Sequence, residues 1–385
     1  MSKVKYQRLG DYIREVDVRN RDLSVATLLG VSISKEFIPS IANTIGTDMS
    51  TYKIVRKGQF AYGPVTSRNG DKVSIALLAN EDTAIISQAY TVFEVKDTNE
   101  LLPEYLMMWF RRPEFDRYAR FHSHGSAREI FDWSEMCDVM LPIPSIERQK
   151  EIVAEYETLS KRIRLNNQMI STLETTAQTL YHKMFVDGID KENLPEGWRM
   201  GILGDFGEVI TGKTPSSENP EDFGEKMPFV TPGDFTSYKK FAIGAERMLS
   251  DIGVNRLKTK ILQKGAVIVT CIGSDMGKVA IASEECVTNQ QMNSIAVNCC
   301  EYSDYLFYAL SLISKELKSM ALGSSTMPML NKSDFECIPI AIPPYGLLRD
   351  FSNSVHAGND LIILKLKENY MLTKIQFLLL AKMGQ

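Results

Sequence analysis

Polar and cationic side chains gather in short segments of the first half of the chain, and their types suit contacts with a nucleic acid. Base edges are read by hydrogen-bond donors and acceptors, whereas phosphates are bound by cations or backbone amides. Five arginines fall within residues 111–128, against the two acidic residues Glu114 and Asp116. A solvated helix face, or a plain hairpin turn at residues 66–72, would explain the same pattern, so these interpretations stay open. The candidate DNA-contacting residues of this half are Thr66, Ser67, Arg68, Asn69, Arg117, Arg120, His122, His124, Ser126 and Arg128.

The second half of the chain carries a comparable set of polar residues in predicted loops. Asn and Gln side chains suit adenine edges, and Lys suits guanine or phosphate. One of these loops, residues 273–277, is bounded by glycines. The candidate DNA-contacting residues of this half are Lys213, Thr214, Ser216, Ser274, Asp275, Lys278, Asn289, Gln290, Gln291, Ser324, Ser325 and Thr326.

One segment has the spacing of a nucleotide-binding loop. Residues 207–214 (Gly-Glu-Val-Ile-Thr-Gly-Lys-Thr) match the P-loop pattern. A working P-loop needs a strand before it and a helix after it, so that backbone amides cradle phosphate. Because Pro215 follows at once and Pro220 comes shortly after, we expect a turn in place of that helix. A P-loop NTPase remains an alternative function.

No other pattern in the sequence predicts catalysis or a metal site. His122 and His124 have no cysteine or carboxylate cluster beside them, and the six cysteines form no CxxC pair and have no histidine at zinc spacing. No nucleophile, base and orienting group stand out together. We therefore expect no catalytic residue, no metal and no cofactor on this chain, and reduced cysteines.

Charge and hydropathy narrow the class of protein. A formal net charge of −4 argues against a nucleic-acid binder that acts alone, because such proteins usually carry a basic footprint. This charge still allows a DNA-binding protein whose partner subunits supply the cationic surface. No stretch of about 18 apolar residues occurs, and the N-terminus lacks the apolar segment of a signal peptide. We therefore expect a cytoplasmic protein.

The two halves of the sequence repeat the same short motifs in the same order. Residues 141–144 (Leu-Pro-Ile-Pro) match residues 340–343 (Ile-Ala-Ile-Pro), and residues 87–88 (Ser-Gln) fall near residues 290–291 (Gln-Gln). Seven such pairs run in order, and their separation settles at about 199 residues. A period of half the chain indicates a duplicated domain. Each half contains short β-branched runs, then a helix, then an extended Pro-rich segment.

A long helix is predicted after each Pro-rich segment. The first starts after Ser145 as N-cap and stops near Gly188. Its inward residues recur at alternating spacings of four and three, a coiled-coil seam interrupted by Asn166, which can fix the register. The seam residues are Ile152, Tyr156, Leu159, Ile163, Asn166, Ile170, Leu173, Ala177, Leu180 and Met184.

The second long helix, residues 345–383, is more apolar and less regular. At 1.5 Å per residue each helix spans roughly 60 Å. Because neither apolar face can stay in water, we expect the two helices to pair antiparallel, with a globular domain at each end. The predicted seam residues of the second helix are Ile363, Leu366, Tyr370, Thr373, Phe377 and Leu380.

With this layout, the chain resembles the DNA-specificity (S) subunit of Type I restriction–modification enzymes. Residues 132–135 (Asp-Trp-Ser-Glu) and 142–152 (Pro-Ile-Pro-Ser-Ile-Glu-Arg-Gln-Lys-Glu-Ile) look like that family's junction between a recognition domain and a conserved helix. Residues 194–198 (Leu-Pro-Glu-Gly-Trp) and 211–216 (Thr-Gly-Lys-Thr-Pro-Ser) look like its entry into the second recognition domain. The resemblance covers essentially the whole chain.

One departure from the family's pattern lies at the second junction. Residues 343–349 lack the Glu-Arg-Gln that stands at residues 147–149. The C-terminal helix is therefore expected to begin later than its counterpart or to dock differently.

The resemblance implies an α+β protein, in which two similar α/β target-recognition domains are joined by two long antiparallel coiled-coil helices with pseudo-twofold symmetry. The implied segments are residues 1–144 (first recognition domain), 145–188 (central helix), 189–344 (second recognition domain) and 345–385 (C-terminal helix).

The implied function is a non-catalytic, sequence-specific DNA-binding subunit that directs methyltransferase and nuclease subunits to a bipartite target. Its partners would be double-stranded DNA, two modification (methyltransferase) subunits and two restriction (motor–nuclease) subunits, with no membrane. S-adenosylmethionine, ATP and magnesium would belong to those subunits. A P-loop NTPase and a purely structural coiled-coil scaffold remain the alternatives. Because the two halves diverge most in their presumed reading loops, the two half-sites should differ in sequence.

Overall fold

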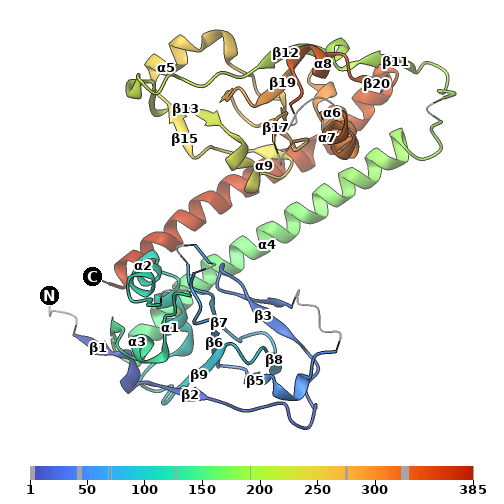
Figure 1. Ribbon diagram of the computed structural model, residues 1–385. Helices are drawn as coiled ribbons and strands as arrows, with labels where there is room; N and C mark the ends of the chain where they lie inside the picture. Colours follow the sequence, from blue (N-terminus) through green and yellow to red (C-terminus); the bar gives the residue numbers. More distant parts are fainter. Residues whose placement is uncertain are drawn as a thin grey trace. The chain divides into compact units, whose positions relative to one another are not determined.

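The chain folds into two compact units (Figure 1). The computed structural model describes residues 5–40, 46–67, 69–70, 72–125, 128–190, 192–273, 276–321 and 329–384. The first unit comprises Met1–Ile163 and Met371–Gln385, and the second unit comprises Arg164–Tyr370. Each unit therefore holds one mixed α/β domain and one part of each of two long helices.

A four-stranded antiparallel sheet forms the centre of the first unit. Its described elements are β1 (Tyr6–Arg8), β2 (Ile13–Val16), β3 (Leu29–Val31), β4 (Phe37–Pro39), β5 (Lys53–Arg56), β6 (Phe60–Tyr62), β7 (Ile75–Leu77), β8 (Thr83–Ile86), β9 (Thr91–Val95), β10 (Met140–Pro142), α1 (Pro103–Phe110), α2 (Pro113–Phe121) and α3 (Trp133–Cys137). The sheet has the order β2–β9–β6–β7. Phe60 and Phe93 stack on neighbouring strands with 4.8 Å between ring centroids, and Phe110 of α1 meets Phe60 edge-on. Aromatic packing thus holds α1 against the sheet.

A five-stranded sheet forms the centre of the second unit. Its described elements are β11 (Arg199–Ile202), β12 (Gly207–Thr211), β13 (Phe223–Val230), β14 (Phe241–Ala242), β15 (Arg247–Leu249), β16 (Val267–Thr270), β17 (Val279–Ala282), β18 (Val287–Thr288), β19 (Met292–Val297), β20 (Pro339–Ile342), α5 (Asp251–Arg256), α6 (Glu301–Leu312), α7 (Ser314–Ala321) and α8 (Lys332–Glu336). The sheet has the order β12–β19–β16–β17–β14, and a smaller sheet has the order β15–β13–β18.

The two units share one topology. The order β2–β9–β6–β7 of the first unit recurs as β12–β19–β16–β17 in the second, strand for strand along the chain. The antiparallel pair β1–β10 likewise recurs as β11–β20. The duplication and the α+β class that the sequence predicts are therefore confirmed.

The first long helix, α4 (Ile146–Phe185), begins and ends where the sequence places it. Ser145 precedes it, and the Ser145 hydroxyl accepts a hydrogen bond from the backbone N–H of Arg148 at 3.4 Å. Gly188 follows with a φ of 75°, a left-handed conformation that glycine adopts without strain and that commonly ends helices.

The second long helix, α9 (Tyr345–Lys382), pairs with α4 inside each unit. In the second unit Asn166 bonds Asn369, and the Tyr181 ring packs against Phe351 with 5.9 Å between centroids. In the first unit Gln376 donates a hydrogen bond to Ser160 at 2.6 Å. Residues later in α4 contact residues earlier in α9, so the two helices are antiparallel, as predicted.

The seam predicted for α9 is wrong at three positions. Tyr370 and Phe377 are each 54% exposed, and Thr373 is also exposed. The inward positions are instead taken by Asn369 and Gln376, which hydrogen-bond to α4. Apolarity alone misplaced the seam by one residue, because polar side chains face the partner helix here and aromatic side chains face outward.

A buried ion pair fastens α9 to the domain of the second unit. Lys240 Nζ lies 2.6 Å from Asp304 Oδ1 of α6 and donates to Asn359 Oδ1 of α9 at 2.9 Å. Asn359 donates in turn to Asp304 at 2.9 Å. Burial lowers the pKa of Lys240, while the attraction of Asp304 opposes that shift.

None of the helices in the described part of the chain combines the length and the apolar character that a membrane span requires. The six cysteines are free thiols.

Candidate nucleic-acid interface

Four strand ends of the second unit meet at one edge of its sheet. Strands β12 and β16 end there at Thr211 and Thr270, and the antiparallel strands β19 and β17 begin there at Met292 and Val279. The loops that leave this edge contain most of the polar residues singled out in the second half of the sequence. The sheet topology therefore brings together segments that are far apart along the chain.

Hydrogen bonds join two of these loops. The backbone N–H of Lys213 donates to the carbonyl of Thr288 at 2.9 Å, and the Thr214 hydroxyl donates to the Gln290 side chain. Asn289 Nδ2 donates to Gln291 Oε1 at 3.2 Å. The side chains of Lys213 and Gln290 remain exposed. Lys213, Thr214, Asn289, Gln290 and Gln291 form one polar surface.

Two further predicted residues lie near this surface. The N–H of Lys278 donates to Thr270 Oγ1 at 3.0 Å, which places Lys278 beside the same sheet edge. Ser216 is exposed, and its hydroxyl accepts from the N–H of Glu218 at 3.3 Å within a turn.

The segment that matches the P-loop pattern does not form a phosphate cradle. Residues Gly207 to Thr211 are strand β12, paired residue by residue with β19. A Cβ at Gly212 would lie 2.1 Å from the Asn289 carbonyl oxygen, and one at Gly207 would lie 2.1 Å from that of Ala296. These glycines therefore permit close approach of the neighbouring backbone. The expected turn after Lys213 is present, and the helix that a P-loop requires is not formed there.

In the first unit, the two predicted DNA-contacting segments meet. His124 and Ile130 form an antiparallel bridge, in which the N–H of His124 donates to the carbonyl of Ile130 at 3.0 Å and the N–H of Ile130 donates to the carbonyl of His124 at 2.9 Å. Thr66, in the β6–β7 loop, donates its N–H to Glu129 at 3.0 Å and its hydroxyl to Ser123 at 2.9 Å. Thr66 is itself buried, so its side chain joins the two segments.

The remaining loop residues of the first unit differ in exposure. Ser67 is exposed, whereas Asn69 is half-buried and donates from its amide to the Val65 carbonyl at 3.2 Å. This supports the hairpin-turn interpretation for Asn69 and leaves Ser67 available to a ligand.

The arginines of this surface are exposed and only partly neutralised. Arg117 lies 3.5 Å from Glu114, and Arg120 pairs with Glu129. Arg128 is exposed and has no carboxylate within ion-pair distance among the residues that the structure describes. The exposed surface here therefore carries both arginines and carboxylates, with Arg128 as the arginine left without a carboxylate partner among the described residues.

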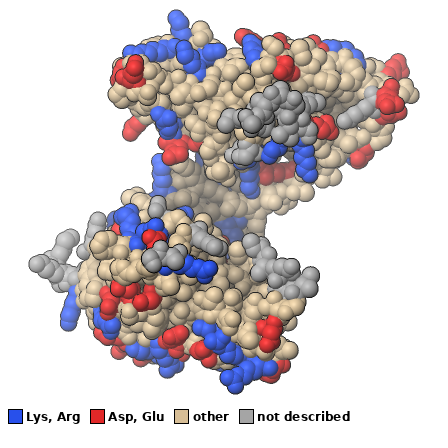
Figure 2. Space-filling view, viewed as in Figure 1, with Lys and Arg blue, Asp and Glu red and all other residues tan. Residues whose placement is uncertain are grey.

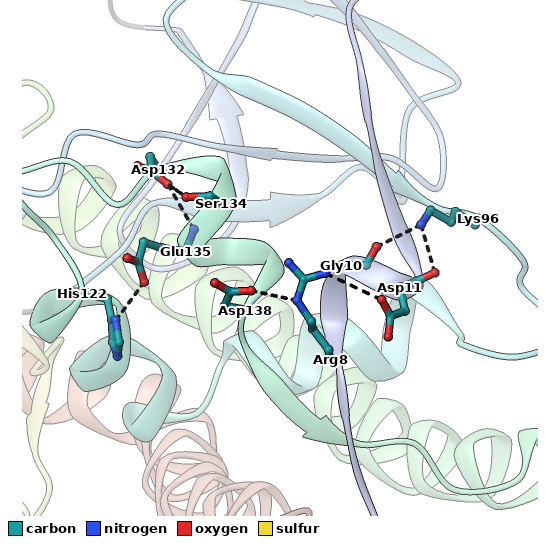
Figure 3. Close-up of polar contacts among 9 residues, drawn as sticks. All are labelled: Arg8, Gly10, Asp11, Lys96, His122, Asp132, Ser134, Glu135 and Asp138. Atoms are coloured by element: carbon teal, nitrogen blue, oxygen red, sulfur yellow. Dashed lines mark hydrogen bonds and ion pairs between the residues drawn. The ribbon is translucent and has the colours of Figure 1, made fainter.

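Glu135 of α3 pairs with His122, as Figure 3 shows, and also lies near His124. His122 Nδ1 lies 2.8 Å from one Glu135 carboxylate oxygen, and His124 Nε2 lies 3.8 Å from the other. Tyr118 stacks on His122 with 4.2 Å between ring centroids, and burial raises the pKa of Tyr118. Within the described residues, no group of three or more His, Cys, Asp or Glu side chains is arranged to bind a metal ion.

Helix α3 is fixed at both ends, as Figure 3 shows. Asp132 accepts hydrogen bonds from the Ser134 hydroxyl at 2.7 Å and from the Glu135 N–H at 3.1 Å, which lower the pKa of Asp132. At the other end Asp138 accepts from Arg8 Nε at 2.8 Å. These bonds fix the helix that carries Glu135 beside His122.

Seven of the predicted site residues lie outside the described residues. They are Arg68, Ser126, Ser274, Asp275, Ser324, Ser325 and Thr326.

The topology adds one candidate that the sequence reasoning did not select. Gln88 is exposed and precedes β9, as Gln290 precedes the equivalent strand β19. The sequence repeat could have identified Gln88, because it places residues 87–88 near residues 290–291.

On the face shown in Figure 2, the coloured Lys and Arg side chains are interspersed with Asp and Glu over both units.

The two helix junctions are equivalent in position but differ in chemistry. Helix α9 begins directly after Pro344, so the expectation of a later start is wrong. Gln149, fully buried in α4, accepts from the Leu102 N–H and donates to the carbonyls of Glu100 and Pro144. Its repeat equivalent is Leu348, which is 1% exposed in an apolar cluster. The expectation of a different docking mode is confirmed.

Comparisons with known proteins agree with this architecture. The HindI Type I restriction enzyme specificity subunit of Haemophilus influenzae is 25% identical over 459 residues, covering 100% of this chain and 99% of that protein. The MjaIX specificity subunit of Methanocaldococcus jannaschii is 31% identical over 189 residues, covering 48% of this chain and 43% of that protein.

The fold itself has a solved counterpart. The crystal structure of a Type I restriction–modification S subunit from M. genitalium superposes with a TM-score of 0.64 at 14% identity, over 100% of this chain and 97% of that chain. The model of the Type I restriction modification DNA specificity domain matches residues 34–175 and 195–347, well over half of the sequence. The chain therefore belongs to the family of Type I restriction–modification DNA specificity subunits.

Proposed function

We propose that this chain recognises a bipartite DNA target without catalysing a reaction, and that each unit reads one half of it. The observation that carries the proposal is the gathering of polar residues at one edge of each sheet. In the second unit these are Lys213, Thr214 and residues 289–291. In the first unit, Thr66 of the β6–β7 loop bonds to Ser123 and Glu129, which lie on either side of the described residues 124–125 and 128. Amides, hydroxyls and cations are the groups that read base edges and position phosphates.

The modification and restriction subunits would dock on the long helices. Helix α9 exposes large apolar side chains, a surface that is costly to leave in water and typical of interaction sites. Two modification subunits and two restriction subunits are proposed, as in the family. The exposed apolar side chains are Leu364, Tyr370, Met371, Ile375, Phe377 and Leu378 on α9, and Leu165 and Met169 on α4.

S-adenosylmethionine, ATP and magnesium would then act on those partner subunits, with all of them in the cytoplasm. The candidate ATP segment of this chain, residues 207–214, starts as a paired strand, which supports placing ATP elsewhere. A purely structural coiled-coil scaffold would give no reason for polar loops to converge in both units.

The test is DNA binding by the chain co-expressed with its modification subunit. We expect binding that weakens steeply with salt, because phosphate contacts release counterions. The Lys213→Ala and Gln290→Ala variants should weaken binding and methylation of the cognate target, whereas Lys332→Ala, an exposed lysine on α8, should not. Wild-type complex that binds no DNA, or variants that methylate like the wild type, would refute the proposal.

A further inference from the structure

Phe121 is a large apolar side chain that the fold leaves in solvent. It is the last residue of α2 and is 82% exposed, whereas the exposed apolar side chains of α9 reach at most 60%. The neighbouring aromatic residues Phe115 and Phe131 are both buried. The Phe121 ring is therefore not part of the hydrophobic core of the first unit.

A series of aromatic contacts nevertheless links the Phe121 ring to the core of the first unit. Phe121 meets His122 edge-on at 5.2 Å between centroids, and His122 stacks on Tyr118 at 4.2 Å. Tyr118 contacts the buried Phe131 edge-on at 6.2 Å. Glu135 fixes His122 from the side at 2.8 Å. Aromatic contacts thus run from the core to Phe121, which reduces the conformational entropy lost when this ring binds a ligand.

Exposed arginines lie close to Phe121 in the sequence, and two of them also pair with glutamates. Arg117 lies one helical turn before Phe121, so the two side chains share a face of α2. Arg120 adjoins it in the chain, and Arg128 is exposed shortly after it in the sequence. An apolar pocket of a protein partner would have to accommodate these arginines. A nucleic acid satisfies both features at once, because its phosphates meet the cations and its bases meet the ring.

We propose that Phe121 contacts a base of the DNA half-site read by the first unit, by stacking on it or inserting at a base step. The inference rests on the proposed function and adds a residue to it. Aromatic and apolar side chains that insert between bases unstack and kink the duplex. Base-pair steps differ in how easily they unstack, so Phe121 would favour target sequences whose step at this position opens easily. This selectivity would add to the hydrogen bonds from the loops.

The experiment measures the affinity of the complex with its modification subunit for cognate duplex DNA. Phe121→Ala should weaken binding about 10-fold, within the range of about 5- to 100-fold that base–aromatic stacking spans. Phe121→Trp should bind within about 2-fold of the wild type, and Phe121→Leu should fall between them. Met140→Ala removes another exposed apolar side chain of the same unit and serves as the control without effect.

Duplexes with a single abasic residue locate the contact. If Phe121 stacks on one base, Phe121→Ala should cause no further loss of affinity when that base is the one removed. The loss of affinity should therefore disappear for an abasic residue at one or two adjacent positions of one half-site and persist for an abasic residue at all others. Affinity of Phe121→Ala equal to the wild type would overturn the inference while leaving the proposed function intact. An equal loss on every duplex, accompanied by loss of the modification subunit, would overturn it in favour of a protein contact. Wild-type complex that binds no duplex would instead refute the proposed function and the inference together.

Discussion

Asn166 of α4 donates a hydrogen bond from Nδ2 to Oδ1 of Asn369 of α9 across 2.9 Å, and the Asn166 side chain is only 3% exposed. Asn369 also donates to Asn167 at 2.9 Å. A buried polar pair inside a helix seam favours the one register in which the two side chains meet. The relative position of the two helices in the second unit is therefore specified by this pair as well as by apolar packing.

Replacing Asn166 by alanine should destabilise the second unit. The change leaves Asn369 without its donor and creates a small void, so we expect a loss of about 1 kcal/mol and a thermal midpoint lowered by roughly 3 °C. Scanning calorimetry of the full chain measures this. Gln168→Ala, at an exposed position of the same helix, should shift the midpoint by less than about 1 °C. An unchanged midpoint for Asn166→Ala would show that the pair does not stabilise the seam.

The buried junction residues Gln149 and Leu348 should not be interchangeable. Gln149→Leu leaves the Leu102 N–H and the carbonyls of Glu100 and Pro144 without their partner, which should cost about 1–3 kcal/mol. Leu348→Gln should cost a similar amount, because it buries an amide in an apolar cluster. Urea unfolding measures both changes, with Arg148→Ala at an exposed position as the control. If Gln149→Leu were as stable as the wild type, the hydrogen bonds of Gln149 would not matter to the junction.

Asp132 should make the first unit sensitive to acid. Hydrogen bonds from Ser134 and from the Glu135 N–H lower the pKa of Asp132 in the folded chain. A carboxyl whose folded pKa is depressed stabilises the fold fully above its unfolded value of about 3.9 and loses that stabilisation as the pH falls through the folded value.

The variant Asp132→Asn keeps an N-cap but cannot titrate. The difference in free energy of unfolding between the wild type and this variant should be constant from about pH 5 to 7. Below about pH 4 the wild type should lose stability relative to the variant. Denaturant unfolding at a series of pH values measures it, with Asp138→Asn at the other end of α3 as a comparison. A pH-independent difference would contradict the role given to Asp132.

The fold could be predicted from the sequence where local chemistry and global packing agree. Ser145, Gly188 and the seam of α4 satisfy the signals of a capped, paired helix, and the repeated motifs disclose the duplication. The helix α9 was predicted, but three positions of its seam were not, because Asn369 and Gln376 face inward while Tyr370 and Phe377 face outward. A single sequence does not distinguish an apolar face that packs inside the chain from one left for a partner.

The candidate site was predictable only in part. The polar types of Lys213 and Gln290 were visible, but their contact depends on the pairing of β12 with β19, which joins residues about 80 positions apart. The burial of Thr66 and the exposure of Phe121 follow from tertiary packing. The position of Gln88 was predictable, because the repeat pairs the residues that precede β9 with those that precede β19.

The claim that each unit reads one half of a split target is tested most directly by mapping DNA methylation in a host that carries this chain with its modification subunit. The wild type should methylate a sequence of two short elements separated by an unread spacer. A chain with Lys213, Gln290 and Gln291 changed to alanine should relax or alter one element only, and one with Arg117 and Arg120 changed should affect the other. A continuous target, or the same change in both elements from either set of substitutions, would contradict the account.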